Sequence, residues 1–329
     1  MGRKVLVTGG AGFIGSNFVR MLVDDPTVDL VRILDKLTYA GSLDNLEDVL
    51  GNPKVEFVRG DIANYDDAHP AMEGIDWVVN FAAESHVDRS LRNPAEFVRT
   101  NIEGVRVLLE IARETKPERF LQISTDEVYG SIAEGCVDET AQLRPSSPYS
   151  ASKASADMLC NAYLTTFGVP VIIARSANNY GPYQYPEKLI PRFVSLALKG
   201  EKLPLYGDGR NIRDWLYVED NCRALLLILK KGKVGEIYNI GAGELHQNIE
   251  IARKILDILG KPEDMITFVA DRPGHDRRYC VNWDKIRALG WEPQAKFEEK
   301  FRETVLWYAR REQWLAKKSE EAEKFYRGQ

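Results

Sequence analysis

With 329 residues and a formal net charge of -5, the chain is long enough for one large or two modest domains, and its charge does not favour nucleic acid or an anionic membrane as partner. No apolar run approaches the roughly 20 residues that span a bilayer, and the chain enters a strand without a signal-peptide pattern, so we expect a cytoplasmic protein. The cysteines Cys136, Cys160, Cys222 and Cys280 form no CxxC pair, and we expect them to be reduced and to bind no metal.

The chain opens with a strand, a glycine-rich turn and a helix. Residues 3–8 form an apolar run typical of a short buried strand, and residues 13–23 follow a helical pattern. Between them, Gly10, Gly12 and Gly15 satisfy the G-x-G-x-x-G spacing. Such glycines allow a tight turn, close approach of the backbone to a pyrophosphate and close helix–strand packing, so the segment predicts a dinucleotide site.

Asp35 lies where a dinucleotide fold places a ribose-binding carboxylate. A second strand over residues 30–34 ends at Asp35, which follows Gly15 by 20 residues. A carboxylate here accepts hydrogen bonds from ribose hydroxyls and repels a 2′-phosphate, so NAD is favoured over NADP. A glycine turn with an incidental aspartate is the alternative, and the strand–turn–helix context argues against it.

Two further strands, over residues 55–59 and 76–82, end in small or polar residues. The alternation of strands and helices predicts an α/β fold with a Rossmann-like, doubly wound parallel sheet and helices on both faces. Asp61 follows the third strand and could accept a hydrogen bond from an adenine amino group or simply belong to a turn. His86 could contact a ligand or lie in a surface loop.

The next strand, over residues 119–123, leads into Thr125, Asp126 and Glu127. Ligands of open parallel sheets bind at the carboxyl ends of the strands, so we expect the acidic pair to lie in a binding site. We expect this segment to be extended, which would direct the two carboxylates to opposite faces. A solvated strand end is the alternative.

A helix expected over residues 148–167 carries Tyr149 and Lys153, which share a face because they are four residues apart. Pro148 suits the first turn of this helix. Another helix, over residues 101–113, is expected to pack on the sheet. An acid, a base and a tyrosine beside a lysine, all near a dinucleotide site, predict redox chemistry coupled to proton transfer.

The regular alternation ends after a strand over residues 169–174. Residues 178–183 are expected to form a loop. A helix over residues 223–230 and a strand over residues 236–240 resume the strand–helix pattern of the first part of the chain. Residues 249–259 have the pattern of an amphipathic helix.

We predict a dinucleotide-binding domain over residues 1–175, with returning elements near residues 215–242, and a smaller mixed α/β domain over residues 176–329. Basic residues gather in the second part: Lys188, Arg192, Arg210, Arg213, Arg272, Arg277 and Arg278. Arginine forks match phosphate geometry, so together these residues predict a pocket for a second, diphosphate-bearing ligand. Residues 309–329, rich in Lys, Arg and Glu, are expected to form a solvated terminal helix.

Together these motifs resemble the extended short-chain dehydrogenase/reductase superfamily and, within it, the dTDP-glucose 4,6-dehydratases. The resemblance is carried by TGGAGFIGS (8–16), LDKLTYAG (34–41), FAAESHVDRS (81–90), STDEVYGS (124–131), SPYSASK (147–153), NNYGPYQYPEKLIP (178–191), PLYGDG (204–209) and DRPGHDRRY (271–279). The glycine motif and Tyr-x-x-x-Lys specify only the superfamily. The Asp-Glu pair, PEKLIP and RPGHDRRY are more specific: a related decarboxylase group typically has Ser-Glu at the pair, and 4-epimerases usually lack it.

The resemblance implies a role for each matching residue. The catalytic residues would be Thr125, Asp126, Glu127, Tyr149 and Lys153. NAD would contact Gly9, Gly12, Phe13, Ile14, Gly15, Asp35, Lys36, Leu37, Thr38, Asp61, Ile62, Ala82, Ala83, Ser85, Thr100, Tyr149, Lys153 and Asn179. The nucleotide sugar would contact Ser85, Thr125, Asp126, Glu127, Asn178, Lys188, Leu189, Pro204, Leu205, Tyr206, Arg213, Asn248, Asp271, Arg272 and His275. No metal is expected.

The implied reaction is the NAD-dependent conversion of dTDP-glucose to dTDP-4-keto-6-deoxy-glucose, a step in deoxysugar biosynthesis. Tyr149, assisted by Lys153 and the nicotinamide charge, would remove the 4-hydroxyl proton while hydride passes from C4 to NAD. Glu127 would take the C5 proton, protonated Asp126 would release the 6-hydroxyl as water, and hydride would return to C6. Thr125 would hydrogen-bond the C4 oxygen. Two adjacent carboxylates in different surroundings can hold the different pKa values that this division requires.

The resemblance also implies a homodimer formed through helices of the first domain. Leu245 stands where the family often has Glu, whereas Asn248 is retained, so the preferred nucleotide base stays open. One alternative is another NAD-dependent nucleotide-sugar enzyme, either a 4-epimerase or a dehydratase for a different nucleotide. The other is a catalytically silent NAD-binding regulatory protein, and the intact catalytic positions argue against it.

Overall fold

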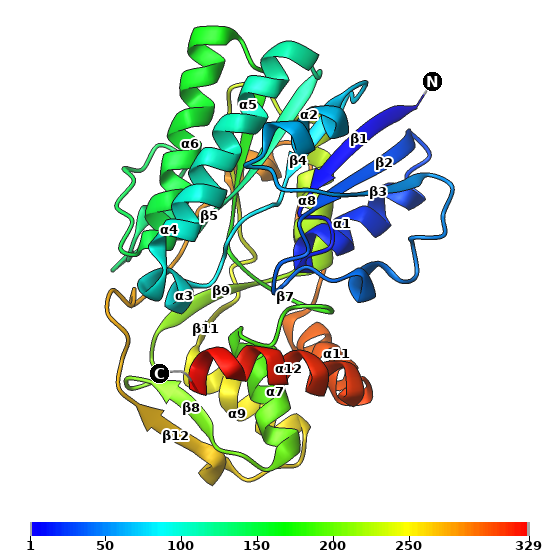
Figure 1. Cartoon of the computed structure of the whole chain (residues 1–329). Coiled ribbons are helices and arrows are strands. Elements are labelled where there is room, and N and C mark those ends of the chain that lie inside the picture. The colour runs from blue at the N-terminus through cyan, green and yellow to red at the C-terminus, as the bar shows by residue number, and fades with distance from the viewer. Residues whose placement is uncertain (1, 328–329) are drawn as a thin grey trace.

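The computed structural model of the protein describes residues 2–327 and contains a central sheet of seven strands. The strand order is β10-β6-β5-β4-β1-β2-β3, and every neighbouring pair is parallel (Figure 1). The strands are β1 (Arg3–Thr8), β2 (Val28–Asp35), β3 (Val55–Arg59), β4 (Trp77–Asn80), β5 (Arg119–Thr125), β6 (Val171–Ser176) and β10 (Ile237–Ile240). The predicted Rossmann-like parallel sheet is confirmed, and its order reverses between β1 and β4, where such sheets bind ligands.

Helices cover both faces of this sheet (Figure 1). One face packs against α1 (Phe13–Asp24) and α8 (Val218–Lys231), and the other against α2 (Tyr65–Met72), α5 (Gly104–Thr115) and α6 (Pro148–Phe167). A separate apolar cluster fills each interface, with Phe18 fully buried in one and Cys160 in the other. Each large apolar side chain buried in this way contributes about 1.5–3 kcal/mol, which makes the sheet a firm platform for a site at its edge.

Shorter elements connect these layers. They are the 3-10 helix Leu43–Leu46, α3 (Val87–Arg92), α4 (Pro94–Phe97), a π-helical turn Val98–Glu103 and a 3-10 turn Asp126–Tyr129. The helix expected over residues 101–113 therefore begins as the π-helical turn and continues as α5.

The second part of the chain builds smaller sheets with their own helices. β7 (Asn178–Tyr180), β9 (Ile212–Tyr217) and β11 (Leu245–Gln247) form one sheet, and β8 (Leu203–Tyr206) pairs with β12 (Ile266–Val269). The helices are α7 (Leu189–Lys199), α9 (Asn248–Ile258), the short α10 (Asp284–Arg287), α11 (Phe297–Arg310) and α12 (Glu312–Arg327), with a 3-10 helix at Glu263–Met265. No helix among residues 2–327 is long and apolar enough to cross a bilayer.

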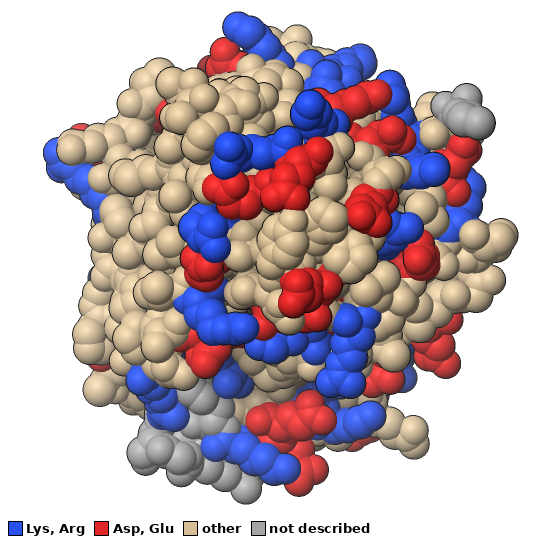
Figure 2. All heavy atoms as spheres, turned by 45° about the horizontal axis from the view of Figure 1, so that its top comes forward, with Lys and Arg blue, Asp and Glu red and all other residues tan. Residues whose placement is uncertain are grey.

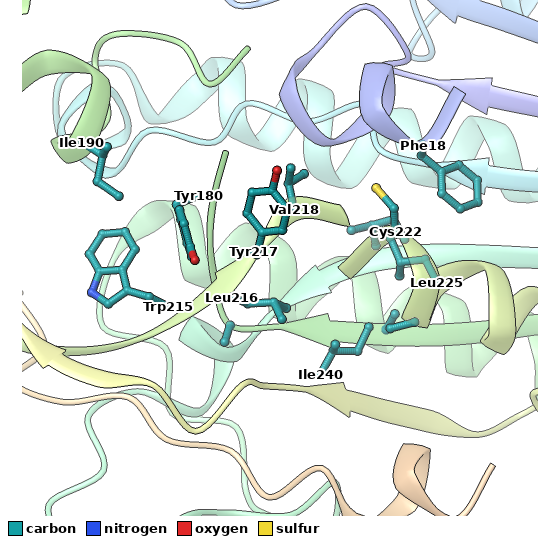
Figure 3. Close-up of a cluster of buried hydrophobic side chains, with 14 of the residues drawn as sticks. Phe18, Tyr180, Ile190, Trp215, Leu216, Tyr217, Val218, Cys222, Leu225 and Ile240 are labelled. Atoms are coloured by element: carbon teal, nitrogen blue, oxygen red, sulfur yellow. The ribbon is translucent and has the colours of Figure 1, made fainter. Parts of the chain in front are cut away.

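The expectation of a loop over residues 178–183 is wrong for its first part, which forms β7 and pairs with β9. Tyr180 is 1% exposed and packs against the rings of Trp215 and Phe301. Figure 3 shows Tyr180 beside Trp215 and Tyr217 in the buried cluster. Tertiary packing, rather than local propensity, fixes this short strand.

The expectation of a solvated terminal helix is wrong for one of its faces. Leu315 and Ala322 are 1% and 0% exposed, and Glu323 pairs with Arg192 of α7 at 3.0 Å. α12 therefore packs one face on the second part of the chain. Residues 328–329 of the predicted helix lie outside the described residues.

Cys136 and Cys280 form a disulfide, so the expectation that all cysteines are reduced is wrong. Their Cα atoms are 4.7 Å apart although 144 residues separate them in the chain, and sequence spacing therefore gave no sign of the pair. The bridge lies next to the parallel pairing of Val137 with Val281, and it ties the loop after β5 to the segment after β12. Cys160 and Cys222 are free and buried.

Candidate active site

A cavity of about 290 Å³ lies at the carboxyl ends of the sheet strands, where the strand order reverses. Most predicted cofactor residues line it: Gly9, Gly12, Phe13, Ile14, Gly15, Asp35, Lys36, Thr38, Asp61, Ile62, Ala82, Ala83, Ser85, Thr100, Tyr149, Lys153 and Asn179. The predicted substrate residues in its wall are Ser85, Thr125, Asp126, Glu127, Asn178 and Lys188. The fold thus gathers the predicted cofactor and catalytic residues into one site.

Two glycines beside the turn between β1 and α1 have no room for a side chain. Gly9 has a φ of 68°, in the left-handed region, and a Cβ on Gly15 would lie 2.3 Å from the Gly9 carbonyl oxygen. Gly12 precedes α1 without a side-chain cap, and the first turn of the helix contains no acidic residue. The helix N-terminus therefore presents its amides to the cavity, and the residues fit a dinucleotide pyrophosphate.

Asp35 is held rigidly at one end of the cavity. Its carboxylate accepts hydrogen bonds from the amides of Ala11 at 2.9 Å and Leu37 at 2.8 Å, while burial raises its pKa. The predicted cofactor residue Leu37 is outside the cavity wall: its φ is 58°, and its side chain packs against the apolar core. The contribution of Leu37 is therefore the amide that orients Asp35.

Asp61 lies at the same end of the cavity, between two cations. It pairs with Lys36 at 2.9 Å and with Arg99 at 2.7 Å. Burial opposes ionisation, but the Ala63 amide and these cations bring the pKa of the Asp61 carboxyl below its usual value. Arg99 was not foreseen from the sequence; it belongs to the π-helical turn that also places Thr100 in the cavity wall.

α6 begins where predicted, with Pro148 in its first turn and Ser147 as its cap, and carries Tyr149 and Lys153 into the cavity wall. Lys153 Nζ donates to the Ile123 carbonyl at 2.6 Å. Burial raises the pKa of the Tyr149 phenol and lowers the pKa of Lys153 to about 8.

The acidic pair works against ionisation of the tyrosine. The charges of Glu127 and Asp126 add to the rise in the pKa of Tyr149 caused by burial, and the Thr125 hydroxyl opposes that rise. A phenolate at Tyr149 therefore requires positive charge in the site, from Lys153 and from a bound cofactor.

Asp126 and Glu127 occupy a 3-10 turn, so the expectation of an extended segment is wrong. The Thr125 hydroxyl accepts a hydrogen bond from the Glu127 amide at 3.3 Å, and this local cap competes with extension of β5. Both carboxylates nevertheless line the cavity.

The two carboxyl groups have different surroundings. Burial, followed by the charges of Glu127 and Asp214, raises the pKa of Asp126 well above its usual value. Burial also raises the pKa of Glu127, but Arg272 and Lys188 oppose that rise. These surroundings therefore favour the protonated form more strongly at Asp126 than at Glu127.

Lys188 and Arg272 reach this region from the second part of the chain. Lys188 Nζ donates to the Ser85 carbonyl at 2.7 Å. Arg272 Nη1 donates to Asp88 at 3.1 Å, and the Tyr206 hydroxyl donates to the other oxygen of Asp88 at 2.9 Å. Asp88 was not foreseen, yet it joins two predicted substrate residues to α3.

Arg213 and His275 lie on the same side as Arg272. Arg213 Nη2 donates to the Asp276 carbonyl at 2.9 Å, and its guanidinium lies 4.3 Å from the centre of the Tyr279 ring. His275 contacts Asp271 at 2.6 Å. Burial lowers the pKa of His275 to about 4, so its imidazole is neutral at pH 7.

Other predicted substrate residues are placed less directly. Leu205 is 2% exposed within the apolar core, so only its backbone could meet a ligand, whereas Leu189 is partly buried and packs against that core. Pro204 is half-buried on β8, and Asn248 is buried at the start of α9. Leu245, which departs from the family pattern, is 37% exposed on β11.

Several of the basic residues that suggested a diphosphate pocket lie elsewhere. Arg277 pairs with Asp208 at 2.7 Å on the surface, and Arg278 donates to the Gly135 carbonyl at 2.6 Å. Arg210 is exposed, and Arg192 pairs with α12. Of the basic residues in the second part of the chain, Lys188, Arg213 and Arg272 are therefore the ones that face the catalytic region.

The cavity wall also contains residues that the sequence did not single out, among them Glu84, Gln184, Tyr185 and Glu187. Glu187 is 3% exposed and pairs with Arg89 of α3 at 2.6 Å. Their positions next to predicted site residues could have indicated them: Glu84 precedes Ser85, and Glu187 precedes Lys188 within the PEKLIP segment.

Comparisons with known proteins agree with this geometry. The family model described as GDP-mannose 4,6 dehydratase matches residues 6–304. The chain is 53% identical to the low-salt glycan biosynthesis protein Agl12 of Haloferax volcanii, over 92% of this chain and 98% of that protein. It is 48% identical to a dTDP-glucose 4,6-dehydratase of Escherichia coli, over 95% of this chain and 94% of that protein.

A solved dehydratase structure is also similar to the chain in sequence and in fold. The dTDP-glucose 4,6-dehydratase DesIV of Streptomyces venezuelae, solved with NAD bound, is 48% identical and superposes with a TM-score of 0.93, covering 94% of this chain and 98% of that chain. With the parallel sheet, the glycine turn, the Tyr149–Lys153 helix and the acidic pair in place, the chain belongs to the dTDP-glucose 4,6-dehydratase family of the extended short-chain dehydrogenase/reductase superfamily.

Proposed function

We propose that the protein converts dTDP-glucose to dTDP-4-keto-6-deoxy-glucose with NAD as cofactor. The observation that carries the proposal is the acidic pair, in which Asp126 favours the protonated form and Glu127 is flanked by cations. Elimination of water needs an acid and a base at one substrate, whereas oxidation of a sugar hydroxyl alone needs neither carboxylate. The same cavity holds Tyr149 and Lys153, which serve the oxidation.

The chain's own residues move the protons of this reaction. Bound NAD would supply the hydride acceptor for C4 and, in its reduced form, the hydride donor for C6. Tyr149 takes the proton of the 4-hydroxyl, and the charge of Lys153 stabilises the phenolate needed for that transfer.

The acidic pair serves the elimination that follows. Once C4 is a ketone, the proton on C5 is acidic, and Glu127 removes it. Asp126 gives its proton to the departing 6-hydroxyl, so that water leaves. The Thr125 hydroxyl donates to the C4 oxygen while charge builds up there.

The second part of the chain would hold the nucleotide diphosphate. Arg213 is 5% exposed and Arg272 is half-buried, and both charges act on Glu127, so a diphosphate bound to them would lie close to the acidic pair. Tyr206 and His275 lie beside them, with their ring centres 6.1 Å apart. We assign these four side chains to the diphosphate end of the substrate.

A dehydratase for a different nucleotide sugar is the second candidate. Leu245 leaves the choice of nucleotide open, because this exposed leucine stands where the family often has a glutamate that affects recognition of the nucleotide base. A 4-epimerase would have no use for the acidic pair, and a silent NAD-binding protein would have no use for the Tyr149–Lys153 pair.

Incubation of the pure protein with dTDP-glucose, without added reductant, tests the proposal. Identification of the 4-keto-6-deoxy product by NMR supports it, whereas a galactose product identifies an epimerase. Parallel incubations with UDP-glucose and GDP-mannose decide between nucleotides.

We further propose a cytoplasmic location and the division into domains at residue 175 described above.

We also propose that the protein is a homodimer. The support is a surface on α6 without charge: Met158 is 60% exposed, and Val98 of the π-helical turn, which contacts α6, is 53% exposed. The exposed residues of α6 include no charged one, and Figure 2 shows an uncharged area on the side where Figure 1 places this helix. The helices of the first domain would pair there. Sedimentation analysis, with Met158→Lys as the disruptive variant, tests it.

A further inference from the structure

A buried carboxylate lies one helical turn beyond the catalytic lysine. Asp157 follows Lys153 by four residues on α6, so the two side chains share a face of the helix. Asp157 pairs with Arg175 of β6 at 2.9 Å, and the two side chains are only 1% and 3% exposed. The reaction as derived above gives neither residue a role.

Three consecutive residues of β5 meet α6 at this point. The carbonyl of Ile123 accepts from Lys153 Nζ, and the hydroxyl of Thr125 acts on Tyr149. Between them, the Ser124 hydroxyl faces Asp157, although no hydrogen bond of ordinary geometry joins the two. The end of β5, which leads into the acidic pair, thus packs against the face of α6 that carries Tyr149 and Lys153.

Arg175 anchors Asp157 from the other side. Arg175 Nη1 donates to the Tyr129 hydroxyl at 2.8 Å, and that hydroxyl donates to Asn239 Oδ1 at 2.8 Å. Asn239 is fully buried on β10. The carboxylate therefore has a fixed position, set by α6, β6 and β10 together.

Lys153 is 5% exposed, and its buried ammonium needs a negative charge nearby to remain charged. The titratable groups that act on it are Asp157 and Cys160. Burial raises the pKa of the Cys160 thiol well above its usual value, so this group is neutral. Asp157 is the carboxylate whose charge favours the ammonium.

We propose that Asp157 is a positioning residue that keeps Lys153 charged and directed at the Ile123 carbonyl, beside Tyr149. Its place in catalysis rests on the proposed function, whereas its effect on Lys153 is a property of the free protein. Asp157 touches neither reacting atom, and it acts through Lys153 alone.

The direct test is an NMR titration of the lysine side chains in isotopically labelled protein, with the Lys153 signal identified by its loss in Lys153→Met. In the wild type, Lys153 should titrate near pH 8. In Asp157→Asn, which keeps the shape and removes the charge, the midpoint should fall by about one pH unit or more. An unchanged midpoint in folded Asp157→Asn would overturn the proposal.

The double variant Asp157→Asn/Arg175→Gln keeps the test decisive if the single change unfolds the protein, because Arg175 is then no longer left buried without its carboxylate. Lys153 still loses its carboxylate, so its midpoint should still fall. A wild-type midpoint in the folded double variant would contradict the proposal.

The pH profile of kcat/KM with dTDP-glucose gives the catalytic consequence. For Asp157→Asn the alkaline limb should move to lower pH while activity near pH 6 stays close to that of the wild type. A purely structural role would instead reduce activity by the same factor at every pH. Because the NMR midpoint needs no substrate, failure of this proposal and failure of the proposed function are distinguishable.

Discussion

Glu127 and Tyr149 serve different steps of the proposed reaction, so their variants should fail differently. Oxidation at C4 needs Tyr149 and NAD but no carboxylate, whereas loss of the C5 proton needs Glu127. In the nearly isosteric Glu127→Gln, enzyme-bound NADH should accumulate while dehydrated product falls by about 10²–10⁴-fold. Stopped-flow absorbance under single-turnover conditions measures both quantities.

The control is Tyr149→Phe, which should form neither NADH nor product. If Glu127→Gln binds dTDP-glucose but forms no NADH, then Glu127 belongs to the redox step and the division of labour is wrong.

Asp35 should set the cofactor preference. Its carboxylate is held by the amides of Ala11 and Leu37 and would repel a 2′-phosphate, so NAD should bind much more tightly than NADP. Calorimetry on cofactor-stripped protein measures both affinities. Asp35→Asn should narrow the difference, and equal affinities in the wild type would refute the assignment.

The first turn of α1 should tolerate no side chain at Gly15, because that residue packs on the glycine turn. In Gly15→Ala the new Cβ would lie 2.3 Å from a backbone oxygen, so the turn must shift at a cost of about 1–3 kcal/mol in the free energy of unfolding. NAD affinity should fall as well, since the helix N-terminus moves. Gly51→Ala is the matched control, because its Cβ would have no neighbour within 4 Å. Equal NAD affinities in the two variants would show that the turn is not the pyrophosphate site.

The disulfide joins two segments that flank the site, and it should stabilise the fold. Cross-linking residues 144 apart restricts the unfolded chain, so Cys136→Ser/Cys280→Ser should lower the free energy of unfolding by about 2–4 kcal/mol. Thermal melts with and without dithiothreitol measure this. Reductant should lower the Tm of the wild type and leave the double variant unchanged; no response in the wild type would mean that the bridge contributes nothing.

For the molecule as a whole, the sequence predicted the parts that local pattern controls. Strand–helix alternation predicted the parallel sheet, and the glycine spacing with Asp35 predicted which edge of that sheet forms the cavity. Each depends on contacts between residues close in the chain or on a periodicity that one segment carries by itself.

Features that depend on distant contacts were missed. β7 exists because Tyr180 packs against aromatic rings from later elements, and the disulfide needs two segments that only the fold brings together. Asp88 carries no local signal, since its partners Arg272 and Tyr206 come from the other part of the chain. The turn at the acidic pair was missed for a local reason, a threonine cap that outweighed the strand pattern.

In the proposed reaction, one protein oxidises C4, eliminates water across C5 and C6, and reduces C6 with the same cofactor. Deuterium placed at C4 of dTDP-glucose and followed by NMR tests it most directly. We predict that the label appears at C6 of the 4-keto-6-deoxy product without added reductant. Return of the label to C4 of a galactose product would contradict the account and identify an epimerase.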